Sequence, residues 1–523
     1  MNEKRQPLSP IKIIQRSTTK QNLSKSYYIH PNTNSMKVGK WCPIFIALFL
    51  VCSTSFSTYA DRVIENDDIP SWADGSFHGT LKINGESYGN IEGYISLKRS
   101  DMSGNISGIW KNGENELPFK GMFYHHILIC FASFPFPIFG FIDFDDTNFN
   151  AYLWHFGKKM QASGTYDASM LPLPGGNYSV GLEVKHLIDE SRDEKITEEP
   201  DDKREMMLYL WYPAEGGGER AEYMKQEEFA YLFKESPIPL FWIPEDAYEY
   251  VRTHSFINAT PADGVFPLVI FSHGYRGYPA MYTSMIENLV SHGFIVAAIT
   301  HPYVAGVTVF PDGRVIELPD LSNKDSEYVQ WYFDTAFEEV IEDIDYVCDY
   351  LLQLNATSTK WSGKIDADRI GIYGHSFGGG AAAMACYDNS HIKAGLAMDG
   401  YFRGDVFEEG MTKPFFMFFV EGRFESDDAL QNFWEVLKGD TYRASILGSA
   451  HQDFTDLPLL FPHFMPNIPR SMIPGFGSID GKQLVKIVNT FTLAFFDVYL
   501  NGKSVDELLS LEDEFDEVIF DHK

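Results

Sequence analysis

The chain has 523 residues, of which 44% are hydrophobic and 15% aromatic, and its formal net charge is −31. This length predicts two or three domains, and the hydrophobic content is ample for a sizeable core. Because binding to a phosphate backbone requires clustered Lys and Arg, the acidity argues against a nucleic-acid partner.

The N-terminal segment 1–60 differs from the acidic remainder. It is basic, and it contains an apolar run at 42–52 followed by small and polar residues that end at Ala60. A basic region, a short apolar region and a small-residue exit are typical of a secretory signal peptide. A transmembrane helix needs about 20 residues, so a membrane anchor is the less favoured alternative. Met36 is an alternative start that would leave a compact signal.

Short apolar segments, each containing a glycine, repeat over residues 61–170. Such strands with turn residues between them predict an antiparallel β meander. Glycine within each strand favours the tight curvature of a small barrel or a flattened sandwich. We expect an accessory domain for binding or spacing, with a partner that the sequence does not specify. The segments lie at 77–81, 91–95, 106–110, 119–123, 139–142 and 163–166.

A Pro/Gly-rich hinge at 172–176 opens the domain that we expect over 171–523. Segments 179–188 and 206–211 predict an antiparallel pair of strands. Continuous apolar runs typical of parallel strands covered on both faces come next, at 268–271, 294–298, 370–373, 394–398 and 415–420. Helices are predicted at 281–291, 325–354 and 482–500, and the acidic tail 505–520 predicts a surface helix. This alternation predicts an α/β domain with a doubly wound, mostly parallel sheet.

A candidate nucleophile follows the strand at 370–373. The chain there reads Gly374-His375-Ser376-Phe377-Gly378 and continues into a small-residue helix. The order of strand, Gly-x-Ser-x-Gly turn and helix is typical of a nucleophile elbow, which exposes Ser376 on a strained turn. The alternative is a Gly-rich turn without chemistry.

A serine nucleophile needs a base and an acid, and in α/β-hydrolases both follow the serine along the chain. Of the histidines downstream, His451 opens a loop after a strand-like segment, where the base is expected. The others lie too near the elbow helix, in a Pro-rich stretch or in the terminal tail: His391, His463 and His522.

Two positions compete for the acid. Asp399 ends the strand 394–398, whereas Asp427 or Asp428 follows the strand 415–420. Both positions lie near carboxyl ends of strands, where ligand crevices form in such sheets. These residues by themselves leave the choice open.

An oxyanion hole needs two backbone N–H groups. One is expected from Phe377, the residue after the nucleophile, and the other from Tyr275 in the loop that follows the strand 268–271. Gly274 favours a close approach of this loop to a ligand. His273, upstream of the serine, is expected to shape the loop rather than to act as the base.

Two further features leave alternatives open. The spacing of Cys130, Cys348 and Cys386 fits no zinc site or disulfide framework, so buried free thiols are expected, with one disulfide as the alternative. The apolar segments 457–476 and 236–242 indicate either a lid or interfacial patch, or buried loop packing.

From about Leu171 onward the chain resembles the single-chain platelet-activating-factor acetylhydrolase family and its bacterial carboxylesterase relatives, within the α/β-hydrolase superfamily. The resemblance implies Asp399 as the acid, and calcium-independent ester hydrolysis with no metal or cofactor. The β region before the hinge lies outside the family pattern. The motifs that carry the resemblance lie at 172–181, 208–213, 271–274, 291–298, 374–379 and 451–454.

These features lead us to expect a secreted serine carboxylic-ester hydrolase that works through an acyl-enzyme. Its catalytic residues would be Ser376, Asp399 and His451, with Tyr275 and Phe377 as oxyanion donors. Small esters or short-acyl phospholipids are the expected substrates, with transient contact to a lipid interface. The alternatives are a polyester, cutin-type or lipase-like hydrolase, and an inactive hydrolase fold used for binding or adhesion.

Overall fold

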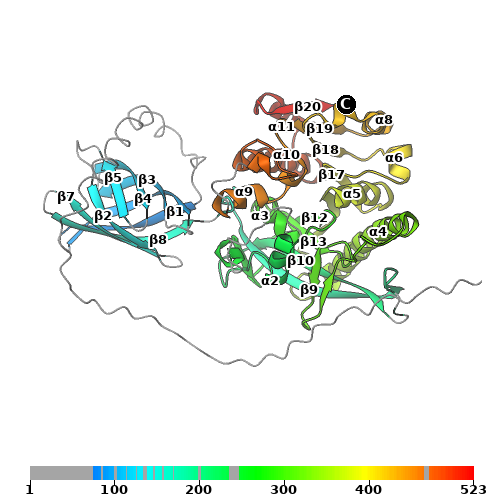
Figure 1. Ribbon diagram of the computed structural model, residues 1–523, viewed down its shortest axis with the longest axis horizontal. Helices are drawn as coiled ribbons and strands as arrows, with labels where there is room; N and C mark the ends of the chain where they lie inside the picture. Colours follow the sequence, from blue (N-terminus) through cyan, green and yellow to red (C-terminus); the bar gives the residue numbers. More distant parts are fainter. Residues whose placement is uncertain are drawn as a thin grey trace, which may run out of the picture. The chain divides into compact units, whose positions relative to one another are not determined.

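The computed structural model describes residues 75–523 (Figure 1). The predicted signal peptide at 1–60 and the apolar segment 236–242 lie outside the described residues. Gaps within the described range fall at 84–85, 99–102, 113–114, 125–126, 133–137, 145–147, 156–157, 169, 198, 200–201, 235–246 and 465–469.

Residues 75–168 form a closed antiparallel barrel in which each strand pairs with its sequence neighbours and the first closes against the last. The predicted β meander is confirmed, and the barrel replaces the alternative of a flattened sandwich. The strands are β1 (Gly75–Ile83), β2 (Glu86–Lys98), β3 (Ser103–Asn112), β4 (Asn115–Tyr124), β5 (Ile127–Ala132), β6 (Ile138–Phe144), β7 (Asn148–His155) and β8 (Lys158–Ala168).

Glycines face each other across the barrel strands. Gly79 pairs with Gly164, and Gly93 pairs with Gly108. A Cβ added at Gly93 would lie 2.1 Å from the Ser107 carbonyl oxygen, and one at Gly164 would lie 2.0 Å from that of His78. The strands therefore approach too closely for any side chain at these positions, which explains the repeated glycines.

The second region is built on a ten-stranded sheet with the order β11-β9-β10-β13-β12-β16-β17-β18-β19-β20. The strands from β13 to β19 run parallel, whereas β10 and β20 join their inner neighbours antiparallel. The strands are β9 (Ser179–Asp193), β10 (Lys203–Ala214), β11 (Ser255–Ile257), β12 (Phe266–Ser272), β13 (Ile295–Thr300), β16 (Ile365–His375), β17 (Ile392–Met398), β18 (Phe415–Val420), β19 (Thr441–Ile446) and β20 (Val518–His522).

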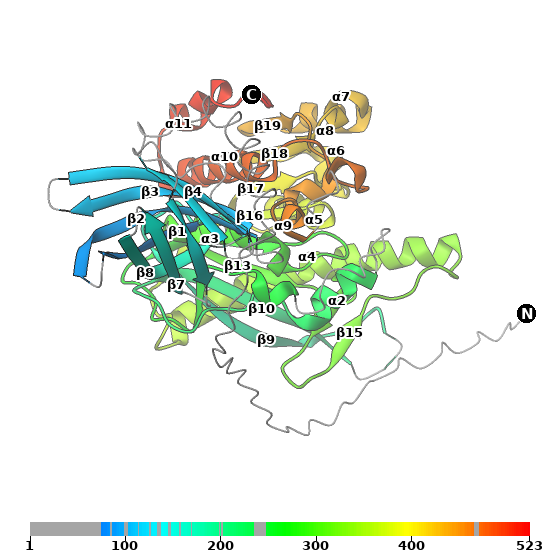
Figure 2. The ribbon, with the colours of Figure 1, turned by 60° about the vertical axis from the view of Figure 1, so that its left-hand side comes forward.

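Helices cover both faces of this sheet (Figures 1 and 2). The strand β12 alternates between two buried clusters: Val269 and Phe271 pack with α3 (Thr283–Ser291) and α10 (Gly481–Asn501), while Ile270 faces α4 (Ser326–Thr357) and α5 (Phe377–Asp388). Burial on both faces explains the continuous apolar runs of the sequence. The predicted mostly parallel α/β sheet is confirmed.

Shorter elements surround this core. They are α2 (Gln226–Lys234), α6 (Asp405–Glu409), α7 (Arg423–Ser426), α8 (Asp428–Val436), α9 (Leu457–Phe464) and α11 (Val505–Leu509), the hairpin β14 (Val307–Val309) with β15 (Val315–Glu317), and the 3₁₀ helices η1 (Ala247–Tyr250), η2 (Pro279–Tyr282), η3 (His451–Phe454), η4 (Arg470–Met472) and η5 (Ser510–Asp513).

The acidic tail differs from its prediction. Helix α11 covers only its start, and the chain ends in β20, an edge strand antiparallel to β19. Phe520 is buried in the core cluster, whereas its neighbour Ile519 is 45% exposed. The prediction of a surface helix over 505–520 was therefore wrong for its second half, because the free edge of β19 offers main-chain hydrogen bonds that no local pattern reveals.

The apolar segment 457–476, which raised the question of a lid, is internal in part, although Met472 is 72% exposed. Leu459, Leu460 and Phe476 of the segment 457–476 are buried in the core cluster, which favours loop packing for its described part. Among the described residues, α10 is the helix long and apolar enough to cross a membrane, but it packs into the same cluster.

The cysteines of this region match their prediction. Cys348 and Cys386 are buried free thiols, and burial raises the pKa of each to about 12. The side chain of Cys130 lies outside the described part of the chain.

Candidate active site

Ser376 occupies a sharp turn between β16 and α5. Its backbone has φ 55° and ψ −116°, and a positive φ is uncommon for a residue other than glycine. Ser376 N donates to the Met398 carbonyl at 2.9 Å, and Gly380 N donates to the Ser376 carbonyl at 3.1 Å. Neighbouring backbone thus holds a strained conformation, as expected for an elbow that presents its side chain.

The flanking glycines are required by close backbone contacts. A Cβ at Gly374 would lie 2.3 Å from the Gly378 carbonyl oxygen, and one at Gly378 would lie 2.2 Å from that of Ser272. At Gly380 the added atom would lie 1.9 Å from the Tyr401 carbonyl oxygen. Side chains at these positions would push α5 away from the sheet, so the motif has a geometric cause.

The structure brings Ser376, His451 and Asp399 together. Ser376 Oγ lies 2.8 Å from His451 Nε2, and His451 Nδ1 lies 2.5 Å from Asp399 Oδ2. The three residues follow β16, β19 and β17, so they meet at the carboxyl ends of nearby parallel strands. Ser376 and His451 are partly exposed, whereas Asp399 is buried.

A cation that the sequence analysis did not single out meets the buried acid. Arg423 Nη1 lies 2.5 Å from Asp399 Oδ1, and the same guanidinium donates to the backbone carbonyls of Asp399 and Gly400 at 2.8 and 2.9 Å. Burial raises the pKa of Asp399, but the hydrogen bond from His451 and the charge of Arg423 outweigh it and lower the pKa. The sequence signal was a basic residue directly after β18, the strand beside that of the acid.

The competing acids have other positions. Asp427 is the N-cap of α8, where its Oδ1 accepts hydrogen bonds from Ala429 N at 2.9 Å and Leu430 N at 3.3 Å. Asp428 is exposed in the first turn of that helix. Asp453 accepts from Ala450 N at 2.9 Å and from Gly477 N at 2.8 Å, so it holds the loop that carries His451.

The segments that carry the two predicted oxyanion donors lie next to Ser376. Phe377 is the first residue of α5, so its N–H has no partner within the helix. This N–H lies at the positive end of the helix dipole. Tyr275 follows Gly274, at which an added Cβ would lie 3.1 Å from Ser376 Cβ. The loop after β12 therefore passes directly beside the nucleophile.

A buried polar network supports this loop from behind. His273 Nδ1 donates to the Gly274 carbonyl at 2.8 Å, and His273 Nε2 accepts from His301 N at 3.2 Å. His301 Nδ1 donates to Asp343 at 2.9 Å, and Arg204 donates to the same carboxylate at 2.7 Å. Burial and the neighbouring His301 lower the pKa of His273 to about 3, which fits a loop-shaping role better than that of a base.

The donor set of the site contains no arrangement suited to a metal. Over the described residues, no group of three or more His, Cys, Asp or Glu side chains could hold an ion. The chemistry that these side chains offer is that of an alcohol, an imidazole and a carboxylate in series.

The chain is similar in structure to a solved ester hydrolase. The structure titled "Ferulic acid esterase from Streptomyces cinnamoneus" superposes with a TM-score of 0.58 and 26% sequence identity, over 67% of this chain and 98% of that one. The fold is therefore similar to that of a solved esterase.

The family follows from the sequence. The sequence model of the family "Platelet-activating factor acetylhydrolase, isoform II" matches residues 164–313 and 339–518, which include every predicted site residue. The chain belongs to this family.

Individual relatives agree. A "Platelet-activating factor acetylhydrolase" from Cavia porcellus is 26% identical over 48% of this chain and 62% of its own length. One from Bos taurus is 24% identical over 74% of this chain and 91% of its own. A "Probable 1-alkyl-2-acetylglycerophosphocholine esterase" from Arthroderma benhamiae is 22% identical over 49% and 66%. The match thus spans about three fifths of the guinea-pig relative.

Proposed function

We propose that this chain is a serine carboxylic-ester hydrolase of the α/β-hydrolase fold, with Ser376 as nucleophile, His451 as base and Asp399 as the orienting acid. The observation that carries the proposal is the hydrogen-bond series from Ser376 Oγ through His451 to Asp399. The positive φ of Ser376 supports it, since strain of this kind is stored at functional sites.

In the proposed acylation step, Ser376 Oγ attacks the ester carbonyl carbon while His451 Nε2 takes the hydroxyl proton. The buried carboxylate of Asp399 orients the imidazole and stabilises its cationic form. The carbonyl oxygen becomes an oxyanion, which the N–H groups of Tyr275 and Phe377 would stabilise. Collapse of the tetrahedral intermediate breaks the ester C–O bond, and His451 gives its proton to the departing alcohol.

Deacylation repeats these steps with water. His451 accepts a proton from water while the water oxygen attacks the acyl carbon of the Ser376 ester. The second tetrahedral intermediate then expels Ser376 Oγ, which regains a proton from His451. The products are a carboxylic acid, an alcohol and the free enzyme, and the cycle needs no cofactor.

The substrate class proposed first is a short-acyl phospholipid or small ester, with transient contact to a lipid interface. The printed names of the relatives support this choice, since they include acetylhydrolases and an alkyl-acetylglycerophosphocholine esterase. Similarity to a ferulic acid esterase favours a second candidate, an esterase for non-lipid esters. Comparing turnover of a short-acyl phospholipid with that of methyl ferulate separates the two.

Secretion and the domain division belong to the same proposal. The basic and apolar pattern of 1–60 supports a cleaved signal peptide, and N-terminal sequencing of protein from culture medium tests this. We propose the division between an accessory domain over 61–170 and a catalytic domain over 171–523. Met170 and Leu171, on either side of it, pack into the core of the sheet region. Proteolysis within 169–176 that left two folded fragments would support that division, and unfolding of either fragment would contradict it.

The proposed function is tested by Ser376→Ala. We expect turnover of p-nitrophenyl acetate to fall by about 10⁶-fold, since loss of the nucleophile removes covalent catalysis. A fluorophosphonate probe should label the wild type and not the variant. The matched control is Ser390→Ala, an exposed serine just after α5, which should label and turn over normally. Unchanged turnover by Ser376→Ala would refute the assignment.

A further inference from the structure

Two side chains behind the proposed triad have no role in the chemistry above. His375 is the last residue of β16, directly before Ser376, and Tyr282 is the last residue of η2, just beyond the oxyanion loop. Both are buried, with 2% and 1% of their surface exposed. They are the point at which the elbow, the oxyanion loop and the base loop meet.

His375 uses both of its ring nitrogens. Its Nε2 lies 3.0 Å from the backbone carbonyl oxygen of His451, and its Nδ1 lies 2.8 Å from Tyr282 Oη. The imidazoles of His375 and His451 also pack together, with 4.7 Å between ring centroids. The backbone of the proposed base is thus tied to a side chain of the elbow.

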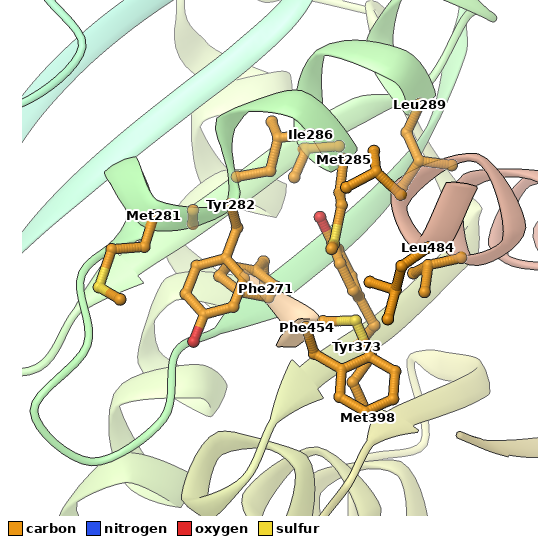
Figure 3. Close-up of a cluster of buried hydrophobic side chains, with 14 of the residues drawn as sticks. Phe271, Met281, Tyr282, Met285, Ile286, Leu289, Tyr373, Met398, Phe454 and Leu484 are labelled. Atoms are coloured by element: carbon orange, nitrogen blue, oxygen red, sulfur yellow. The ribbon is translucent and has the colours of Figure 1, made fainter. Parts of the chain in front are cut away.

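Tyr282 extends this series of hydrogen bonds to the proposed oxyanion loop. Its hydroxyl oxygen lies 3.5 Å from Gly274 N, at the long end of the hydrogen-bond range. A Cβ added at Gly277 would lie 3.4 Å from the same oxygen, so the hydroxyl is seated inside the turn from Gly274 to Gly277. The ring packs on Phe271 with 4.6 Å between centroids, which fixes its position (Figure 3).

The donor and acceptor of each hydrogen bond in this series follow from the two backbone groups at its ends, the His451 carbonyl and the Gly274 N–H. A backbone carbonyl only accepts, so Nε2 of His375 carries the hydrogen that bonds to His451. The neutral ring then has Nδ1 as an acceptor, so the Tyr282 hydroxyl donates to it. The remaining lone pairs of that hydroxyl face the N–H of Gly274. Burial and the neighbouring His451 lower the pKa of His375 to about 3, so the ring is neutral near neutral pH.

We propose that His375 and Tyr282 are positioning residues, which hold the base loop and the oxyanion loop in register through one directed hydrogen-bond chain. The proposal rests on the proposed function, because it assigns a purpose to the alignment of those two loops. Neither side chain touches the reacting atoms. His375 acts on the reaction through the backbone carbonyl and the ring of His451, and Tyr282 acts through the backbone of Gly274.

The consequence is kinetic. Without the hydrogen bonds of His375 and Tyr282, the His451 carbonyl and the Gly274 loop are no longer held by the same pair of side chains. The residues of the substrate-binding surface are unchanged. A displacement of about 1 Å in such a site can cost roughly 100-fold in rate. The loss is therefore expected in kcat rather than in KM.

Tyr282→Phe tests this, with Tyr373→Phe as the matched control. Tyr373 lies in the same cluster and is fully buried (Figure 3). Its hydroxyl has no hydrogen-bond partner among the residues that the structure describes. We expect Tyr282→Phe to lower kcat for p-nitrophenyl acetate by about 10- to 100-fold with KM changed less than about twofold. Tyr373→Phe should keep the wild-type kcat. Equal kcat values for the two variants would overturn the proposal.

A second pair of variants guards against a folding effect. The amide of Gln can donate to the His451 carbonyl and accept from Tyr282, as the neutral imidazole does, whereas Leu can do neither. His375→Gln should therefore retain at least about tenfold more kcat than His375→Leu at equal thermal midpoints. Equal losses in the two variants would contradict the proposal. Ser376→Ala is measured alongside: if it also retained turnover, the proposed function itself would fail, independently of this pair.

Discussion

Asp399 is the buried charged residue of the site, and it interacts with both His451 and Arg423. It is buried in a left-handed conformation with φ 47°, and it contacts His451 with one carboxylate oxygen and Arg423 with the other. Its N–H donates to the Phe418 carbonyl of the next strand at 2.8 Å. The carboxylate is held ionised by its cation and held in place by backbone, which suits an orienting acid.

Asp399→Asn and Asp427→Asn form a discriminating pair. The amide of Asn at 399 can donate to His451 Nδ1, which would hold the imidazole in the wrong tautomer. We therefore expect kcat to fall by about 10⁴-fold. Asn at 427 remains a good helix cap, so its kcat and thermal midpoint should stay close to the wild type. Hydrolysis of p-nitrophenyl acetate measures both. A loss confined to the variant at 427 would refute the choice of acid.

The residues that local reasoning missed share one property. Arg423, His375 and Tyr282 come from different elements and act on partners far away in sequence, at separations of 24, 76 and 93 residues. Ser376, His451 and the oxyanion loop could be predicted because each belongs to a motif with its own strand and turn. A partner chosen by packing leaves no such local mark.

At the scale of elements, β20 shows how an edge is completed. The strand pairs with β19 at the end of the sheet, with Phe520 buried and its neighbour Ile519 exposed. Phe520 stacks on Phe416 and Tyr442 with centroid separations of 6.1 and 6.2 Å. The C-terminal residues therefore cover apolar surface and an otherwise open edge.

Phe520→Ala should destabilise the sheet region strongly. Removing a buried Phe leaves a cavity beside Phe416, so we expect a loss of roughly 3–5 kcal/mol in the free energy of unfolding. Ile519→Ala, one residue earlier on the exposed side, should cost only about 0.5 kcal/mol. Urea unfolding followed by circular dichroism measures both. Similar small losses in both variants would mean that β20 does not belong to the folded core.

At the scale of the whole molecule, the buried ion pair of Arg204 and Asp343 links distant parts of the sheet region. It belongs to a larger charge network that includes Arg192, Glu194 and Glu339. Arg204 on β10 and Asp343 on α4 are fully buried, and Asp343 also accepts from His301 after β13. Burial raises the pKa of Asp343, but the charge of Arg204 and the hydrogen bond from His301 lower it well below its ordinary range. Through His273 this pair also supports the oxyanion loop.

The stabilisation from this pair should depend on pH. The folded-state pKa of Asp343 is depressed below the unfolded value of about 3.9, so its contribution is present above about pH 4 and is lost as pH falls toward the folded pKa. Asp343→Asn should cost roughly 3–5 kcal/mol at pH 7, and the gap to the wild type should narrow below about pH 4. Glu338→Gln, exposed on the same helix, is the control. Thermal midpoints at pH 7, 5, 4 and 3 measure the effect, and a gap independent of pH would contradict it.

Much of this architecture is written locally. Continuous apolar runs marked the parallel strands, because burial on both faces excludes polar side chains, and the glycine repeat marked the curved strands of the barrel. The elbow could be predicted from its Gly-x-Ser-x-Gly pattern, because a strained turn between strand and helix tolerates few residue types at its flanks. The sequence by itself thus determined most element types outside the acidic tail, the α/β class and the positions of Ser376, His451, Tyr275 and Phe377 within candidate loops.

Only the tertiary structure decided which residues meet. It paired Asp399 rather than Asp427 with His451, a choice that the residues left open and family resemblance had to make. It closed the meander into a barrel, turned the acidic tail into an edge strand, and joined Arg423, His375 and Tyr282 to the site. The physical reason is common to all of these: strand order, free edges and buried hydrogen bonds are long-range properties, which the periodicity of a segment does not encode.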